Sequence, residues 1–114
     1  MGKHTEKINK LAEKKKTGKI AGYLNDKDLE TRIDAIRALG RCGGEEAINR
    51  LMTQMASHNP QERIEVAKAL GECGPDAAFY QLSHYAAQET DAAVKEAMKE
   101  AMGKIHKRTN EKDV

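Results

Sequence analysis

The sequence predicts an all-α fold, a right-handed α-solenoid of about three helical hairpins preceded by an N-terminal helix. A stretch at residues 32–43, R-I-D-A-I-R-A-L-G-R-C-G, recurs at residues 63–74 as R-I-E-V-A-K-A-L-G-E-C-G. The shift of 31 residues lies in the period range of helical repeat proteins. Apolar residues recur at helical spacing along the chain, and the alternating β-branched or aromatic runs that indicate strands are absent.

Length and composition favour one domain without a membrane segment. The 114 residues are rich in Ala, Lys and Glu and include one Phe, three Tyr, no Trp and two Pro. No apolar run approaches the roughly 18 residues that a membrane span requires, and the N-terminus lacks the apolar core of a signal peptide. We therefore expect a cytoplasmic protein that has no membrane partner.

The N-terminal part is expected to form two separate helices. An apolar stripe over residues 4–16 predicts the first, with Thr5 as its N-cap. A straight continuation through Ile20 would give this helix a second apolar face. We therefore expect a break before a short helix over residues 18–25, with Thr17 as its N-cap.

Turn signals divide the rest of the chain into further helices. Asp28, Asn59 and Thr90 stand where N-caps are expected, and Glu62 is expected to complete a capping box with Asn59. The predicted helices cover residues 28–41, 45–57, 60–72, 76–88 and 91–105. Together with the helix over 18–25 they form three hairpins, each with a first (A) helix and a second (B) helix.

This layout predicts a single domain over residues 1–105. Its parts are the N-terminal helix over 4–16 and repeats over 17–43, 44–74 and 75–105. The polar residues 106–114 are expected to form a disordered tail. The third repeat matches the other two less well, as is usual for a terminal repeat that has one flank in water.

The B-helix pattern R-I-x-x-x-x-A-L-G-x-C-G resembles the short HEAT-like repeat first described in bilin lyases. The consensus of that family runs roughly V-R-x-x-A-x-x-A-L-G-x-I-G, and the matching residues here are Ala38-Leu39-Gly40 and Ala69-Leu70-Gly71, with Cys42 and Cys73 at the usual Ile. The resemblance covers residues 17–105. It implies a HEAT-like superhelix whose members mostly serve as protein-binding scaffolds, with a minority that are enzymes or enzyme accessories.

No catalytic residue, cofactor or metal site is expected. Cys42 and Cys73 are repeat-equivalent, so they should lie about one helix spacing apart, roughly 8–10 Å. A disulfide requires Cα atoms within about 7 Å, so both thiols are expected to fill the seam between repeats. The four His are scattered, and none is followed by the Glu of the paired His-Glu motifs that hold iron in HEAT-type hydroxylases.

The candidate partner-binding site consists of charged rows on the B helices. Steps of 31 residues give an acidic row beside a basic row, and the candidate residues are Asp34, Glu65 and Glu96, Arg37, Lys68 and Lys99, together with Arg41 and Glu72. These charges either form ordinary pairs within each helix, worth about 0.2–0.5 kcal/mol each, or line a recognition groove. The resemblance places them on the concave face.

The expected function is that of a non-catalytic adaptor that binds an unidentified protein partner through this face. One alternative is nucleic-acid binding through the basic N-terminal arm (Lys3, Lys7, Lys10 and Lys14–Lys16), since residues 1–19 carry a net charge of +5. Another is an accessory role in a bilin-lyase-like enzyme, which rests on the resemblance alone. Homodimerisation is a further expectation, through an apolar end face containing Met98 and Met102.

Overall fold

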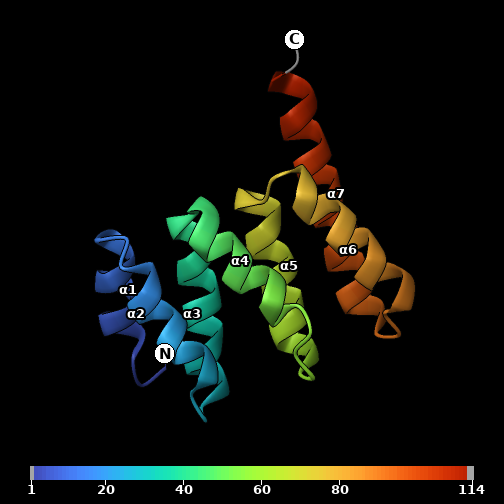
Figure 1. Ribbon diagram of the computed structural model, residues 1–114. Coiled ribbons are helices and arrows are strands. Elements are labelled where there is room, and N and C mark those ends of the chain that lie inside the picture. The colour runs from blue at the N-terminus through green and yellow to red at the C-terminus, as the bar shows by residue number, and fades with distance from the viewer. Residues whose placement is uncertain (1, 113–114) are drawn as a thin grey trace.

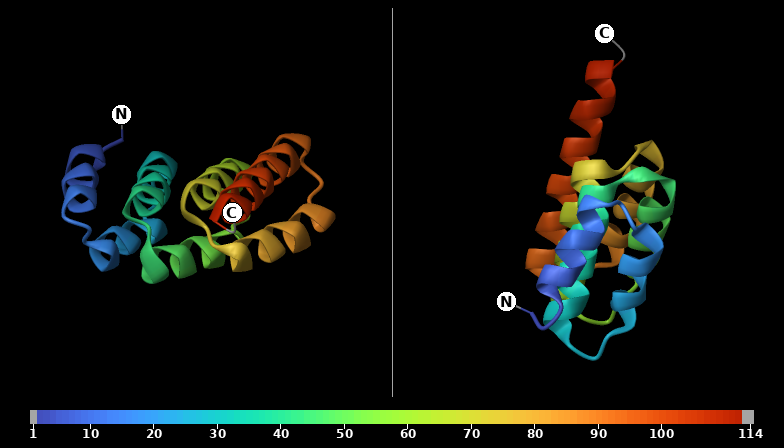
Figure 2. Two further views of the ribbon diagram at one scale, coloured as in Figure 1. Left: turned by 90° about the horizontal axis from the view of Figure 1, so that it is seen from above. Right: turned by 90° about the vertical axis from the view of Figure 1, so that its left-hand side faces the viewer.

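The helices of the computed structural model, which describes residues 2–112, stack in two layers (Figures 1 and 2). The B layer contains α1 (Thr5–Glu13), α3 (Leu29–Cys42), α5 (Pro60–Cys73) and α7 (Ala92–Lys112). The A layer contains α2 (Thr17–Ala21), the 3-10 helix η1 (Gly22–Asn25), α4 (Gly44–Gln54) and α6 (Asp76–Gln88). Residues 2–112 contain no strand, and the predicted all-α solenoid of helical hairpins is confirmed.

Helix α1 closes the N-terminal end of the B layer by packing against α3. Ile8 is fully buried, the Thr5 Oγ1 donates to Asp34 Oδ2 at 2.5 Å, and Arg41 Nη2 donates to Asn9 Oδ1 at 2.8 Å. The cap predictions for these helices were wrong. Thr5 lies inside α1 and bonds across to α3, while α2 begins at Thr17 without a side-chain cap.

The hydrophobic core lies between the two layers. The largest fully buried side chains come from every helix of the stack: Ile8, Ile20, Ile36, Leu39, Leu51, Met55, Val66, Leu70, Leu82, Val94, Met98 and Ile105. The apolar end face expected at Met98 is therefore wrong for that residue, and Met102 beside it is half-buried. Burial follows the 31-residue step for Ile20, Leu51 and Leu82 in the A layer and for Ile36, Ala67 and Met98 in the B layer, because these equivalent positions face the same layer contact in each hairpin.

The glycine of each Ala-Leu-Gly triplet lets neighbouring B helices approach closely. A Cβ on Gly40 would lie 2.9 Å from the Cβ of Ala69, and a Cβ on Gly71 would lie 3.1 Å from the Cα of Ala101. Real Cβ atoms essentially never lie as close as the contact at Gly40, so this position requires glycine at the present helix separation, whereas a side chain at Gly71 would require α7 to shift by a few tenths of an ångström. Both glycines lie within their helices, two residues before the last residue.

The two Cys-Gly helix ends differ although their sequences are alike. Gly43 and Gly44 both adopt positive φ, 63° and 82°, and the chain reverses directly into α4. Gly74 is extended instead, with φ −73° and ψ 143°. The difference follows from Pro75, because a proline disfavours helical conformations in the residue before it.

The predicted cap of α5 is confirmed, whereas the cap of α7 was wrong. Asn59 Oδ1 accepts hydrogen bonds from the backbone N–H groups of Gln61 and Glu62 at 2.8 and 3.3 Å. Glu62 does not complete a capping box, because its carboxylate is buried and bonded elsewhere. At α7 the capping side chain is Asp91, whose Oδ1 accepts from Ala93 N and Val94 N at 2.9 and 3.1 Å.

The prediction of a disordered tail is wrong for residues 106–112, which continue α7 past the rest of the stack (Figure 1). Arg108 explains this extension. Its Nη1 donates to the carbonyl of Gly71 at 2.8 Å and to that of Glu72 at 3.3 Å, and its Nη2 donates to the carbonyl of Gly74. The cation thus satisfies the free carbonyls at the negative end of α5. Residues 113–114 of the expected tail lie outside the described residues.

Candidate functional site

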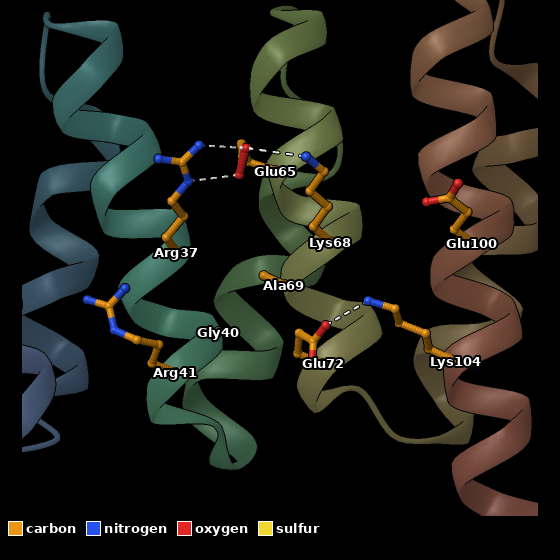
Figure 3. Close-up of a pocket in the computed structure, with 9 residues that line it drawn as sticks. All are labelled: Arg37, Gly40, Arg41, Glu65, Lys68, Ala69, Glu72, Glu100 and Lys104. Atoms are coloured by element: carbon orange, nitrogen blue, oxygen red, sulfur yellow. Dashed lines mark hydrogen bonds and ion pairs between the residues drawn. The ribbon is translucent and has the colours of Figure 1, made fainter.

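A groove of about 580 Å³ crosses the B layer from α3 over α5 to α7 (Figure 3). Small residues and charged residues line it together. The lining residues are Arg37, Gly40, Arg41, Glu65, Lys68, Ala69, Glu72, Glu100 and Lys104. The close approach of α3 and α5 at Gly40 and Ala69 therefore lies within this groove.

The groove contains one pair of charged residues at i, i+4 spacing from each B helix. These pairs are Arg37 and Arg41 on α3, Lys68 and Glu72 on α5, and Glu100 and Lys104 on α7. Residues four apart lie on the same face of a helix, one turn above the other. The three helices therefore present their charged side chains to one shared surface, as Figure 3 shows.

Arg37 and Glu65 form a bidentate ion pair between neighbouring repeats. Arg37 Nε donates to Glu65 Oε2 at 3.0 Å and Nη2 donates to Oε1 at 2.9 Å. The hydrogen bond from Arg37 lowers the pKa of Glu65, whose side chain is only 11% exposed, and the same bond raises the pKa of Arg37. The pair within α5, Lys68 with Glu65, is looser at 4.0 Å. The shortest ion pair in the charged rows, Arg37 with Glu65, therefore joins α3 to α5. The sequence had suggested pairs within one helix or a recognition groove, and neither interpretation described a pair between helices.

Five of the eight candidate residues line the groove: Arg37, Arg41, Glu65, Lys68 and Glu72. Asp34 instead accepts the hydrogen bond from α1, and the remaining two, Glu96 and Lys99, are exposed on α7 outside the groove lining.

Sequence reasoning missed Glu100 and Lys104, which α7 contributes in place of the predicted residues. The third repeat has Ala101 where the first two have a leucine, and this small residue lies against Gly71. The neighbouring Glu100 then faces the groove, and Lys104 donates to Glu72 Oε1 at 2.8 Å. The spacing of charges at i, i+4 in each B helix was the available signal.

Arg32 joins the first repeat to the second at the turn end of the hairpins. Its Nη1 donates to the backbone carbonyls of Asp26 and Lys27 at 2.8 and 3.0 Å, and its Nε donates to Glu62. The Glu62 carboxylate also accepts from Ser57 Oγ at 2.7 Å and Gln54 Nε2 at 3.1 Å. Burial alone would raise the pKa of Glu62, but these hydrogen bonds outweigh burial and lower it.

Arg63 repeats this arrangement between the second and third repeats. Its Nη1 donates to the carbonyl of Ser57 at 3.0 Å, and its Nε and Nη2 bind the two carboxylate oxygens of Glu89 at 3.0 and 2.9 Å. The hydrogen bond from Arg63 lowers the pKa of Glu89. The equivalent position in the third repeat is Val94, which is fully buried in the core. These two arginines therefore hold the stack together and lie away from the groove lining.

The basic N-terminal arm comprises Lys3 before α1, two lysines on α1 and three in the turn after it. The side chains named for nucleic-acid binding, Lys3, Lys7, Lys10 and Lys14–Lys16, are all exposed. A second hollow between α1 and α3 is lined by Asn9, Ala12, Glu13 and Arg41. Arg41 lines both hollows, and the lysines of the basic arm line neither of them.

The ligand groups that hold metal ions and the state of the two cysteines were the remaining questions of site chemistry. No three His, Cys, Asp or Glu side chains there gather into a group that could hold a metal ion. Cys42 and Cys73 are free, half-buried thiols that pack against the core, and burial raises the pKa of Cys73. None of the helices in this part of the chain has both the length and the apolar character needed to cross a bilayer.

Stacked helical hairpins with a repeating core and a shared surface on their second helices define an α-solenoid repeat protein. The family model described as HEAT repeats matches residues 18–108, and the chain belongs to this family. No match was found among curated proteins. HEAT repeats generally serve as protein-interaction scaffolds and are typically non-enzymatic.

Proposed function

We propose that this chain is a non-catalytic adaptor that binds a protein partner in the groove across α3, α5 and α7. The observation that carries the proposal is that charged pairs from three successive B helices line one groove, whose volume is about 580 Å³. Arg32 and Arg63 hold the repeats in register from the turn end, so the surface is formed before a partner binds. A preformed surface loses less conformational entropy on binding than a flexible one.

Nucleic-acid binding through the N-terminal arm stays the alternative. The exposed lysines of α1 and its turn support it, whereas the groove lining mixes three acidic with four basic residues. Binding to phosphates would depend steeply on salt, because each neutralised phosphate releases a counterion.

The test is a capture experiment in which each variant has a matched control. The immobilised chain is exposed to lysate of the source organism and washed at low and at high salt. Lys68→Glu reverses an exposed charge in the groove, and Arg50→Glu makes the same kind of change on the exposed face of α4. Both variants are expected to unfold at nearly the wild-type temperature, because neither residue is tightly paired.

A discrete protein that survives high salt, is retained by Arg50→Glu and is lost with Lys68→Glu would support the proposal. Equal capture by all three chains would show that binding lies elsewhere. If only nucleic acid is captured, if it is released at high salt and if Lys68→Glu captures as much as wild type, the result would support nucleic-acid binding by the basic arm instead.

A further inference from the structure

We infer that the partner presents an acidic peptide segment, whose carboxylates lie over Gly40 and Ala69 between Arg41 and Lys68. This inference rests on the proposed function and names the chemistry of its partner. Three properties of the groove carry it: two exposed cations, of which one is unpaired and the other only loosely paired, a floor of small residues, and the net positive charge of the segment beside α3.

The first property is that Arg41 has no ion pair with residues 2–110 and that Lys68 has only a loose one. Arg41 donates to the neutral amide oxygen of Asn9 at 2.8 Å, and none of the ion pairs among these residues involves it. Lys68 lies 4.0 Å from Glu65, but this carboxylate already accepts two hydrogen bonds from Arg37. Both cationic side chains are exposed, so an incoming carboxylate can reach them without displacing a buried partner.

The other charged residues of the groove are less able to bind an incoming carboxylate. Lys104 is engaged by Glu72 at 2.8 Å, and Arg37 is engaged by Glu65. Glu100 is the acidic side chain at the α7 end of the groove, and it would repel a carboxylate placed there. The part of the groove that favours an acid is therefore the part between α3 and α5. In Figure 3 the Arg41 side chain extends from α3 on the side away from α5, and the Lys68 side chain extends toward Glu65, so both exposed side chains turn toward Gly40 and Ala69 when they bind the acid.

The second property is the floor. Gly40 and Ala69 lie between these two cations and carry no large side chain, so the backbone of a bound peptide can approach the B helices closely. Close approach brings the carboxylates of the peptide to the level of the cationic head groups. It also excludes water, which strengthens each charge-assisted hydrogen bond.

The third property is the net positive charge of the segment beside α3. Arg41 lines the groove and also the hollow beside α1, which Glu13 lines as well, and residues 1–19 carry a net charge of +5. At the opposite end of the groove the lining residues of α7 are Glu100 and Lys104. The positive charge of residues 1–19 therefore attracts an acidic segment toward the Arg41 side of the groove.

The test selects short random peptides displayed on phage against the wild-type chain. The selected sequences are expected to be enriched in Asp and Glu. Their affinity is then measured for wild type, Arg41→Glu, Lys68→Glu and the control Arg50→Glu. We expect about five-fold weaker binding for each reversed groove cation, the ratio that corresponds to roughly 1 kcal/mol, and unchanged binding for the control.

The outcomes separate this inference from the proposed function. If the selected peptides are neutral or basic and still bind the groove variants more weakly, the groove is a protein-binding site but its partner is not acidic, and the inference is refuted. Peptides that bind all chains equally, or no enrichment at all, would overturn both. The neutral variants Arg41→Gln and Lys68→Gln, checked by circular dichroism, provide folded proteins if a reversal unfolds the chain, and they are expected to weaken binding by a smaller factor in the same direction.

Discussion

Replacing Glu62 by Gln should cost far more stability than the same change at an exposed ion pair. The Glu62 side chain is 3% exposed and accepts hydrogen bonds from Arg32, Ser57 and Gln54. Glutamine keeps the shape but removes the charge, and its amide N–H₂ replaces one of the accepting oxygens. One donor is then left without a partner, and the Arg32 guanidinium, 22% exposed, loses its counterion.

The expected cost follows from these contacts. A hydrogen bond to a charged group contributes about 1.5–3 kcal/mol, and breaking a fully buried ion pair costs about 3–5 kcal/mol. Because Arg32 retains some exposure and two backbone carbonyl partners, we expect the lower part of this range, about 2–3 kcal/mol. For a chain of this length the melting temperature should fall by about 8–12 °C.

The matched control is Glu72→Gln, which removes the same charge from the exposed pair with Lys104, where the side chains are 66% and 59% exposed. Its cost should stay within about 0.5 kcal/mol, as for most exposed ion pairs. Both variants are measured by urea denaturation followed by circular dichroism. Equal costs for Glu62→Gln and Glu72→Gln would refute the argument that Arg32 and Glu62 hold the first two repeats together.

Three further predictions use the same denaturation assay. Gly40→Ala should lower the free energy of unfolding by about 1–3 kcal/mol, because the added Cβ clashes with Ala69. Gly103→Ala adds a Cβ with nothing within 4 Å and should raise the free energy of unfolding by up to about 1 kcal/mol. Two changes of the same sign would contradict the argument that Gly40 is required by helix packing. Arg108→Ala should lower the free energy of unfolding by about 1–2 kcal/mol, because the C-terminal carbonyls of α5 lose their hydrogen-bond donors. Lys107→Ala, at an exposed neighbouring position, should leave it unchanged. Equal effects of the two substitutions would show that Arg108 does not hold the end of α7 against α5. The free energy of unfolding should decrease as the pH is lowered below 4.5, the ordinary pKa of a glutamate carboxyl. A carboxylate whose pKa is lowered in the fold stabilises it fully above that pH and loses this contribution as it becomes protonated. Glu62→Gln should make this decrease shallower, and an unchanged dependence of the free energy on pH would contradict the lowered pKa of Glu62.

The fold could be predicted because its determinants repeat in the sequence. The 31-residue step fixed the helix pairs, and Asn59 with Pro60 identified the start of α5 from local chemistry alone. The end of α7 could not be found in this way. Residues 106–112 look polar and unstructured by composition, but Arg108 binds carbonyls 34 to 37 residues earlier in the chain. A contact over that distance has no local signature.

The candidate site was predicted in part for a related reason. The repeat placed Arg37, Arg41, Lys68 and Glu72 on the B helices, where they line the groove. It could not show that Arg37 reaches Glu65 of the next helix, because that contact depends on how closely α3 and α5 approach. The extrapolation to α7 also failed, since Ala101 replaces a leucine of the repeat and other side chains face the groove.

The central claim is that partners bind the B layer, between α3, α5 and α7. The most direct measurement is an NMR titration of the isotope-labelled chain with the partner or peptide recovered above, which reports the backbone amide of each residue. We predict that the largest shifts cluster at Gly40, Arg41, Lys68 and Ala69, with little change on the exposed face of α4 around Arg50. Shifts concentrated on α4 and α6, with the groove amides unchanged, would contradict the account.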